Sequence, residues 1–268
     1  MTEELFLKLC IYIIGGILGL CVGSFLNVVI YRLPNNMSLA SPPSHCTACD
    51  YSLKWYDNIP VLSYLFLGGK CRKCKTKISP RYMIVELANA VFWLLSIAIF
   101  WNISIIYACA MAIVSSVLIC IFFIDLEHML IFNRFTLIVA LGGIVAMFFD
   151  TKTVWYDHII GAVSGGLIFL GVYYGALLVL KKEGLGFGDV KYAAAAGLLL
   201  GWQKFILAIL IASVVGSIVM IILNRISDAE KQKEYPFGPY LAVATLIAMF
   251  FGNIIVSWYI EFVRGALM

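Results

Sequence analysis

The sequence has little charge. Charged residues make up 13% of its 268 positions, whereas 63% are hydrophobic and the mean hydropathy is +0.98. Soluble domains are about half apolar and about a quarter charged. The composition therefore argues against a soluble domain and predicts a membrane protein with several spans.

Three other features are also missing. Residues 1–8 lack the basic segment of a signal peptide, and the apolar run that follows continues to Ile30, which favours a spanning helix. No glycine-rich nucleotide-binding fingerprint is visible, and the halves lack the repeat symmetry expected of a transporter. The net charge of +4 is explained by the membrane topology and by contact with membrane lipid. We therefore expect no nucleic-acid partner.

Eight apolar runs approach the length of about 20 residues that a spanning helix needs. They lie near 9–31, 83–101, 103–124, 135–149, 159–180, 190–203, 205–223 and 239–262. The fourth and sixth runs are short, so seven spans remain an alternative. The sequence predicts an all-α polytopic membrane protein with about eight transmembrane helices.

Basic residues are unevenly distributed among the loops. Eight alternating spans place 32–82, 125–134, 181–191 and 224–238 on one side, and these regions hold 15 of the 19 lysines and arginines. An excess of basic residues marks the cytoplasmic side of a membrane. We therefore expect these regions in the cytoplasm and the N-terminus outside.

The only sizeable polar region follows the first span and contains two Cys-x-x-Cys pairs. Cys46 and Cys49 form the first pair, and Cys71 and Cys74 form the second. Two such pairs can complete a four-sulfur zinc site, and a metal can stabilise a region with little apolar core. Two disulfides or a redox pair are alternatives, which a reducing cytoplasm disfavours. The pattern predicts a small zinc-bound cytoplasmic insertion.

Two aspartates lie at membrane edges on the expected cytoplasmic side. Asp125 ends the third apolar run, and Asp189 opens the sixth, after Gly186 and Gly188. Ionisable groups at such depth indicate function. Two neighbouring aspartates share a proton, so that one activates water while the other polarises a carbonyl, without any metal. The glycines allow positive φ and close approach of an extended substrate.

The aspartates also have simpler interpretations. Asp189 begins a helix, where aspartate caps the N-terminus, whereas Asp125 ends one, where a negative charge is disfavoured. A transporter with a proton-relay carboxylate pair is a further alternative. An aspartic intramembrane protease with other substrates is another. The two aspartates alone leave these alternatives open.

An ordered series of motifs resembles the type IV prepilin peptidase family, whose bifunctional members are leader peptidase/N-methyltransferases. Around the cysteine pairs and Asp125, the series comprises GSFLNVVIYRLP at 23–34, WYDNIPVLSYL at 55–65, ISPRYMIVEL at 78–87, GFGDVK at 186–191 and PFGPYLA at 236–242. The resemblance covers nearly the whole chain. One departure is Ile131-Phe132-Asn133, where many members have Leu-Pro-Asp.

The resemblance implies a bacterial plasma (inner) membrane enzyme with two activities. A peptidase, for which Asp125 and Asp189 match the catalytic pair, removes the short basic leader of type IV prepilins and pseudopilins at the cytoplasmic face. It needs no cofactor. An N-methyltransferase then methylates the new N-terminus with S-adenosylmethionine, an activity associated with the cysteine loop, whose four cysteines match the family's.

The implied organisation has three parts. Residues 1–31 form the first transmembrane helix, 32–82 the cysteine (zinc) domain associated with N-methylation, and 83–268 a seven-helix peptidase core.

Four further residues are candidates for supporting roles. Lys191 is expected to support the catalytic loop with the two glycines, by steadying the aspartate pair or by reaching lipid phosphate. Asn27 and Arg32 end the first span, and Arg32 is equally a topology anchor. Glu86 is a lone carboxylate at the start of the second span. It is a candidate for contact with the amine, S-adenosylmethionine or a basic leader, with a helix N-terminal charge as the alternative.

Overall fold

A computed structural model describes residues 3–181, 184–226 and 235–266, in which every regular element is a helix. The longer helices are α1 (Glu3–Arg32), α3 (Arg81–Phe100), α4 (Ile105–His128), α5 (Asn133–Phe149), α6 (Trp155–Leu180), α7 (Phe187–Leu200), α8 (Trp202–Ile226) and α9 (Gly238–Ala266). A 3₁₀ turn, η1 (Trp55–Asn58), and the short α2 (Leu62–Phe66) lie in the region between α1 and α3.

The eight longer helices occupy the eight predicted apolar runs. In the described part of the chain, six of them are long and apolar enough to cross a membrane, namely α1, α3, α4, α6, α8 and α9. Helices α5 and α7 have 17 and 14 residues. At 1.5 Å per residue they measure about 26 and 21 Å, less than the roughly 30 Å hydrocarbon core of a bilayer. The expected shortness of the fourth and sixth helices is confirmed.

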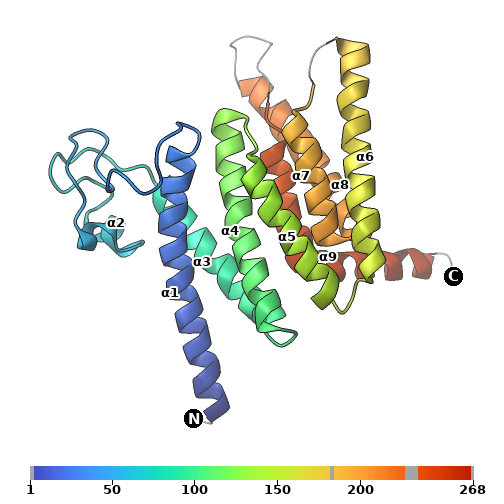
Figure 1. Cartoon of the computed structure of the whole chain (residues 1–268), viewed down its shortest axis with the longest axis horizontal. Helices are drawn as coiled ribbons and strands as arrows, with labels where there is room; N and C mark the ends of the chain where they lie inside the picture. The colour runs from blue at the N-terminus through green and yellow to red at the C-terminus, as the bar shows by residue number, and fades with distance from the viewer. Residues whose placement is uncertain (1–2, 182–183, 227–234, 267–268) are drawn as a thin grey trace.

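The helices alternate in direction along the chain. Helices α1, α4, α6 and α8 end, and α3, α5, α7 and α9 begin, at the end of the bundle beside the cysteine region (Figure 1). We call this the cysteine end. Both Asp125 and Asp189 lie there, as alternating spans predict. Of the basic residues counted in the loops, Lys182, Lys231 and Lys233 lie outside the described residues.

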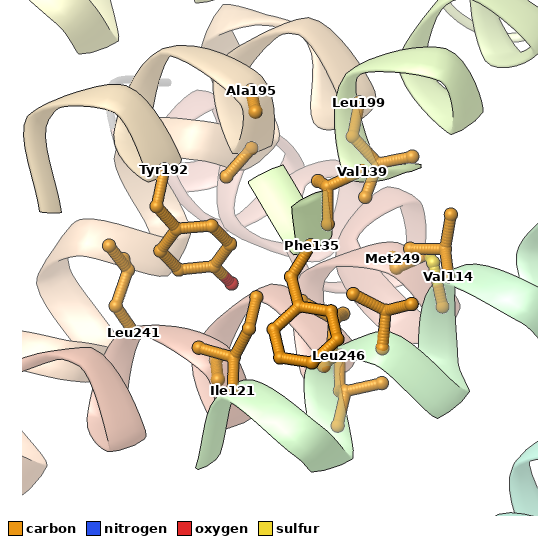
Figure 2. Close-up of a cluster of buried hydrophobic side chains, with 14 of the residues drawn as sticks. Val114, Ile121, Phe135, Val139, Tyr192, Ala195, Leu199, Leu241, Leu246 and Met249 are labelled. Carbon is orange, nitrogen blue, oxygen red and sulfur yellow. The ribbon is translucent and has the colours of Figure 1, made fainter. Parts of the chain in front are cut away.

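The core lies among α4, α5, α7 and α9. Figure 2 shows Val114, Ile121, Phe135, Val139, Tyr192, Ala195, Leu199, Leu241, Leu246 and Met249 packed together. Tyr192 is completely buried, and its hydroxyl donates a hydrogen bond to Thr245 Oγ1 at 3.0 Å. Because Tyr192 lies one turn after Asp189, this contact joins the Asp189 helix to α9.

Helix α7 is held most closely by α6. Gly161 of α6 and Gly197 of α7 face each other, and a Cβ on Gly197 would overlap the Gly161 carbonyl oxygen. Glycine at both positions therefore permits direct backbone packing. At the opposite end of α7 from Asp189, the buried His158 ring of α6 contacts the Leu198 carbonyl oxygen at 2.8 Å from Nδ1. These contacts fix a helix that is too short to span a bilayer alone.

Polar contacts attach the N-terminal helices to the bundle. Asn27 Nδ2 donates to the Tyr82 carbonyl at 3.0 Å and joins α1 to α3. Helix α3 then contacts α4 through an ion pair between Arg81 and Glu127 at the cysteine end. Glu127 follows Asp125 by two positions, so the cysteine region and the aspartate site are linked through the start of α3.

Candidate active site and metal centre

Asp125 and Asp189 come together from different helices. Asp125 lies in the last turn of α4, and Asp189 is the third residue of α7. The two residues are only 5% and 9% exposed, and Asp189 lies within the electrostatic influence of Asp125. A buried pair of neighbouring carboxyl groups favours sharing a single proton because two adjacent negative charges repel.

A third helix contributes its first residue to this pair. Gly238, the first residue of α9, lies directly against the Asp125 carboxylate. A Cβ on Gly238 would lie 2.9 Å from Asp125 Cγ, so only glycine allows this approach. Helix N-termini carry unsatisfied N–H groups and a partial positive charge. Asp125, unfavourably placed at the end of its own helix, therefore faces the favourable end of another.

Asp189 has a different environment. Gly186 is the N-cap of α7 and lies next to Oδ2 of Asp189. In contrast, Asp189 Oδ1 is buried and has no hydrogen-bond partner among the described residues. An unpaired buried oxygen is costly, and this cost falls when the oxygen gains a proton or a donor. Asp189 is therefore the better of the two positions for the shared proton.

Gly186 and Gly188 do not use the positive φ that glycine allows. Gly186 has a φ of −69°, Gly188 lies inside α7, and neither is among the residues with positive φ. Their lack of a side chain matters in another way. A Cβ on Gly188 would lie 3.2 Å from Ile131 Cβ, and one on Gly186 would lie 3.2 Å from Asp189 Oδ2. The glycines allow the α4–α5 connection and the carboxylate to lie against the start of α7.

Lys191 contacts the start of α5. Its Nζ donates to Asn133 Oδ1 at 3.1 Å and lies 5.1 Å from the centre of the Phe187 ring. At the position of Asn133, many members of the prepilin peptidase family have aspartate. The structure therefore shows Lys191 linking α7 to α5, whereas we expected it to steady the aspartate pair or reach lipid.

The four cysteines of the polar region form one cluster. The sulfur atoms of Cys46, Cys49, Cys71 and Cys74 all lie within 4.8 Å of one another, and Cys46 and Cys74 are 3.8 Å apart. In a zinc site with Zn–S bonds of about 2.3 Å, neighbouring sulfurs lie about 3.8 Å apart. A disulfide needs about 2.05 Å, and all eight cysteines of the chain are free. The arrangement fits a tetrahedral metal site.

The two cysteine pairs adopt matching backbone turns. Cys46 N–H donates to the Tyr51 carbonyl and Cys71 N–H to the Thr76 carbonyl, each at 2.9 Å. The residue four positions after each leading cysteine has positive φ, 53° at Asp50 and 61° at Lys75. Each turn points two sulfurs toward the other pair, so the cluster is assembled from two copies of one local motif.

The thiols of this cluster compete for negative charge. Hydrogen bonds from the Thr76 side chain and backbone lower the pKa of Cys74 to about 6. The pKa of Cys49 is about 12 despite the hydrogen bond from the Tyr51 backbone, because burial and the neighbouring thiols disfavour a second charge. A bound divalent cation removes this conflict because coordinated thiols are deprotonated. The chemistry of the donor set therefore fits Zn²⁺.

Asp57 connects the two cysteine turns. Its side chain is buried and accepts a hydrogen bond from Arg72 Nε at 2.6 Å and one from the Tyr51 hydroxyl at 3.2 Å. Burial alone would raise the pKa of Asp57, but the hydrogen bonds from Arg72 and from the Lys54 backbone hold it below its usual value. The sequence shows Asp57 only as a carboxylate in a polar loop, and its burial and its two side-chain partners appear only in the structure.

Asn27, Arg32 and Glu86 are all buried near the cysteine region. Asn27 makes the α1–α3 contact described above. Arg32 Nη1 donates to the Ser38 carbonyl at 3.0 Å, and Nη2 to the Pro42 carbonyl at 2.7 Å. Glu86 Oε2 accepts the Val61 N–H at 2.7 Å. Arg32 and Glu86 therefore hold the polar region against the ends of α1 and α3.

Comparisons with known proteins agree with this geometry. Residues 17–101 match the family model for the bacterial peptidase A24 N-terminal domain, and residues 112–221 match that for the type IV leader peptidase family. A Pseudomonas aeruginosa protein named prepilin leader peptidase/N-methyltransferase is 38% identical over 92% of each chain. A protein of the same name from Aeromonas salmonicida is 36% identical over 91% of each.

A third relative, from enterotoxigenic Escherichia coli, is named type 4 prepilin-like proteins leader peptide-processing enzyme. It is 36% identical to this chain, over 87% of this chain and 91% of its own length. No solved structure matches the chain. The identities and coverage show that the chain belongs to the type IV leader peptidase family.

Proposed function

We propose that this chain is a prepilin leader peptidase and N-methyltransferase of the bacterial plasma (inner) membrane. The observation that carries this proposal is the buried Asp125–Asp189 pair at the same end of the bundle as the four-sulfur cluster. Its substrates are type IV prepilins or the pseudopilins of type II secretion. Both sites face the cytoplasm, and the N-terminus lies outside.

Peptide cleavage uses the two aspartates and a water molecule. Asp125, which faces the N-terminus of α9, is the ionised member, and Asp189 carries the shared proton. Asp125 takes a proton from water as the water oxygen attacks the scissile carbonyl carbon, while Asp189 donates its proton to the carbonyl oxygen. When the C–N bond breaks, the amine nitrogen takes a proton from Asp125, and Asp189 recovers its own from the collapsing intermediate.

The position of the pair suits a substrate that stays partly in the bilayer. A prepilin has a hydrophobic helix immediately after its leader. That helix remains in the membrane while the basic leader projects into the cytoplasm. The excess of basic residues in the loops at the cysteine end supports a cytoplasmic position for this end. The scissile bond then lies at the depth of Asp125 and Asp189.

Methylation belongs to the cysteine region. We assign residues 1–31 to an anchoring helix, 32–82 to a zinc domain and 83–268 to the peptidase core. Cys46, Cys49, Cys71 and Cys74 hold Zn²⁺, which orders the region. S-adenosylmethionine supplies an electrophilic methyl group. When bound, it would methylate the free N-terminal amine of the cleaved prepilin, which gives up a proton to water.

Both activities are testable in one assay. Purified protein in liposomes is given a prepilin, with or without S-adenosylmethionine, and the product N-terminus is identified by mass spectrometry. We expect leader removal in both samples, and a mass gain of one CH₂ group only with the methyl donor. A prepilin that stays intact refutes the peptidase, and cleavage without the mass gain refutes the methyltransferase.

Substitution of Gly238 tests the asymmetry of the aspartate pair. Gly238→Ala is expected to reduce the cleavage rate by roughly 100-fold, because the added Cβ displaces Asp125 from the α9 N-terminus and catalytic groups tolerate little misplacement. Initial cleavage rates at saturating prepilin measure this effect.

Gly265→Ala is the matched control because it lies in the same helix and its Cβ would meet nothing within 4 Å. It should cleave like the wild type. A Gly238→Ala protein with full activity would show that α9 does not position Asp125.

A further inference from the structure

A cleft opens between the end of α1 and the polar region. Its volume is about 390 Å³, within the range of small-molecule sites. One wall is a single face of α1, from Cys21 through Ser24, Phe25 and Val28 to Arg32. At 1.5 Å per residue this face is about 16 Å long. The opposite wall is formed by segments 39–44 and 58–60.

A buried cation lies at one end of this cleft. Arg32 is 5% exposed, and its Nη atoms donate to the carbonyls of Ser38 and Pro42, with a longer contact to that of Leu39. A guanidinium has five N–H groups, so at least two remain for a ligand. These contacts also hold the opposite wall in place. The site is therefore built around a fixed group that suits a carboxylate.

A buried anion lies beside the other part of the cleft. Glu86 is 8% exposed, accepts a hydrogen bond from the Val61 N–H, and lies against Gly23, next to the cleft residue Ser24. Among the described residues, no lysine or arginine forms an ion pair with Glu86. A buried charge without a partner is costly. A cationic ligand would compensate this charge.

The backbone next to Glu86 is strained. Val61 has a φ of 61°, which is unfavourable for a β-branched residue. Its N–H is the group that binds Glu86 at 2.7 Å, and the preceding Pro60 lines the cleft. Strain of this kind persists where the surroundings fix it and is concentrated at ligand sites.

We propose that this cleft binds S-adenosylmethionine, an inference that rests on the methyl-transfer function proposed above. The ligand's carboxylate pairs with Arg32, and its cationic sulfonium lies toward Glu86. Phe25 is 51% exposed and offers a ring surface for the adenine. The arrangement matches an elongated ligand with opposite charges and one flat apolar group.

The location also suits the order of the two reactions. Helix α3 carries Glu86 one to two turns after Arg81, and Arg81 pairs with Glu127 near Asp125. The cleft and the aspartate pair therefore lie at the same end of the bundle and are linked through the contact between α3 and α4. A newly released N-terminus reaches the methyl donor without leaving this end of the bundle.

Direct binding tests the proposal independently of turnover. Full-length protein in nanodiscs of zwitterionic lipid is titrated with S-adenosylhomocysteine by calorimetry, so that no anionic headgroup competes for Arg32. Val28→Trp, which fills the cleft, and Phe25→Ala, which removes the ring, are each expected to weaken binding by about tenfold or more. Ile17→Trp, on an exposed part of α1 that does not line the cleft, is the matched control.

The outcomes distinguish the proposed binding site from the proposed methyltransferase function. Binding by the wild type and by Ile17→Trp, with loss in the two cleft variants, supports the proposal. If Val28→Trp and Phe25→Ala bind like the wild type, the cleft is wrong although the methyltransferase stands. If the wild type neither binds S-adenosylhomocysteine nor methylates prepilin, both are wrong. Prepilin cleavage by each sample shows whether the protein is folded.

Discussion

Asp125→Asn and Asp189→Asn are each expected to reduce prepilin cleavage by roughly 10³-fold or more, as for other residues that act as a catalytic unit. An amide can neither accept the proton of the attacking water nor return a proton to the carbonyl. The substitutions are isosteric, so folding and zinc content should persist. Initial rates of leader removal in liposomes, with metal content of the same samples, provide the measurement.

Two further variants sharpen this test. The double variant should be about as inactive as either single one, because the carboxyl groups act together. Asp157→Asn should retain full activity, since Asp157 lies at the other end of the bundle and an asparagine oxygen can still accept the Trp202 Nε1 hydrogen bond. If either aspartate variant cleaved prepilin at the wild-type rate, the catalytic pair would be wrong. Asp125 and Asp189 would then be only charged residues at helix ends.

Loss of the metal is expected to unfold the cysteine region. Structural zinc contributes on the order of 10 kcal/mol to folding in small metal-dependent domains, and Cys71 is the most buried of the four cysteines. Cys71→Ser should therefore lose zinc, become sensitive to proteolysis between residues 44 and 78, and lose methylation. Metal analysis by mass spectrometry and limited proteolysis with product mapping measure these effects.

Cleavage of prepilin should survive this loss because α4 and α7 carry the aspartates. Cys109→Ser is the control, since Cys109 is a free, exposed cysteine within α4. It should keep zinc and both activities. A Cys71→Ser protein that retains stoichiometric zinc, or a wild-type protein that contains none, would contradict the metal site.

Local patterns in the sequence were enough to predict most of the fold. Apolar runs located all eight longer helices, because the length of such a run is a property of neighbouring residues. The spacing of Cys46, Cys49, Cys71 and Cys74 predicted a cluster that the structure brings together. The positions of Asp125 and Asp189 at membrane edges likewise identified them as candidate catalytic residues from the sequence alone.

Contacts between distant residues could not be predicted in this way. Lys204 lies outside the predicted cytoplasmic loops and had no expected partner, yet its Nζ lies 2.8 Å from Asp150 Oδ2 and both side chains are buried. Gly238 lies within PFGPYLA, which the sequence marked only by its resemblance to the family, and nothing in its neighbours indicates contact with Asp125. The partners of Asp57 and Lys191 were missed for the same reason. Pairing across the fold depends on how helices pack, which one sequence does not specify.

The shortness of α7 has a consequence for the surrounding bilayer. At about 21 Å, α7 falls short of the hydrocarbon thickness, and it carries Asp189 at its first turn. Helix α7 itself is packed inside the bundle, but its neighbour α5 is also short and exposes Leu137, Leu141 and Ile144. Hydrophobic mismatch at such a helix makes lipids thin locally around a protein. Bulk solvent would then penetrate deeper beside the aspartates than elsewhere on the membrane surface. Hydrolysis of a peptide bond at membrane depth requires water at that bond. The short helices of the bundle would therefore help water to reach it.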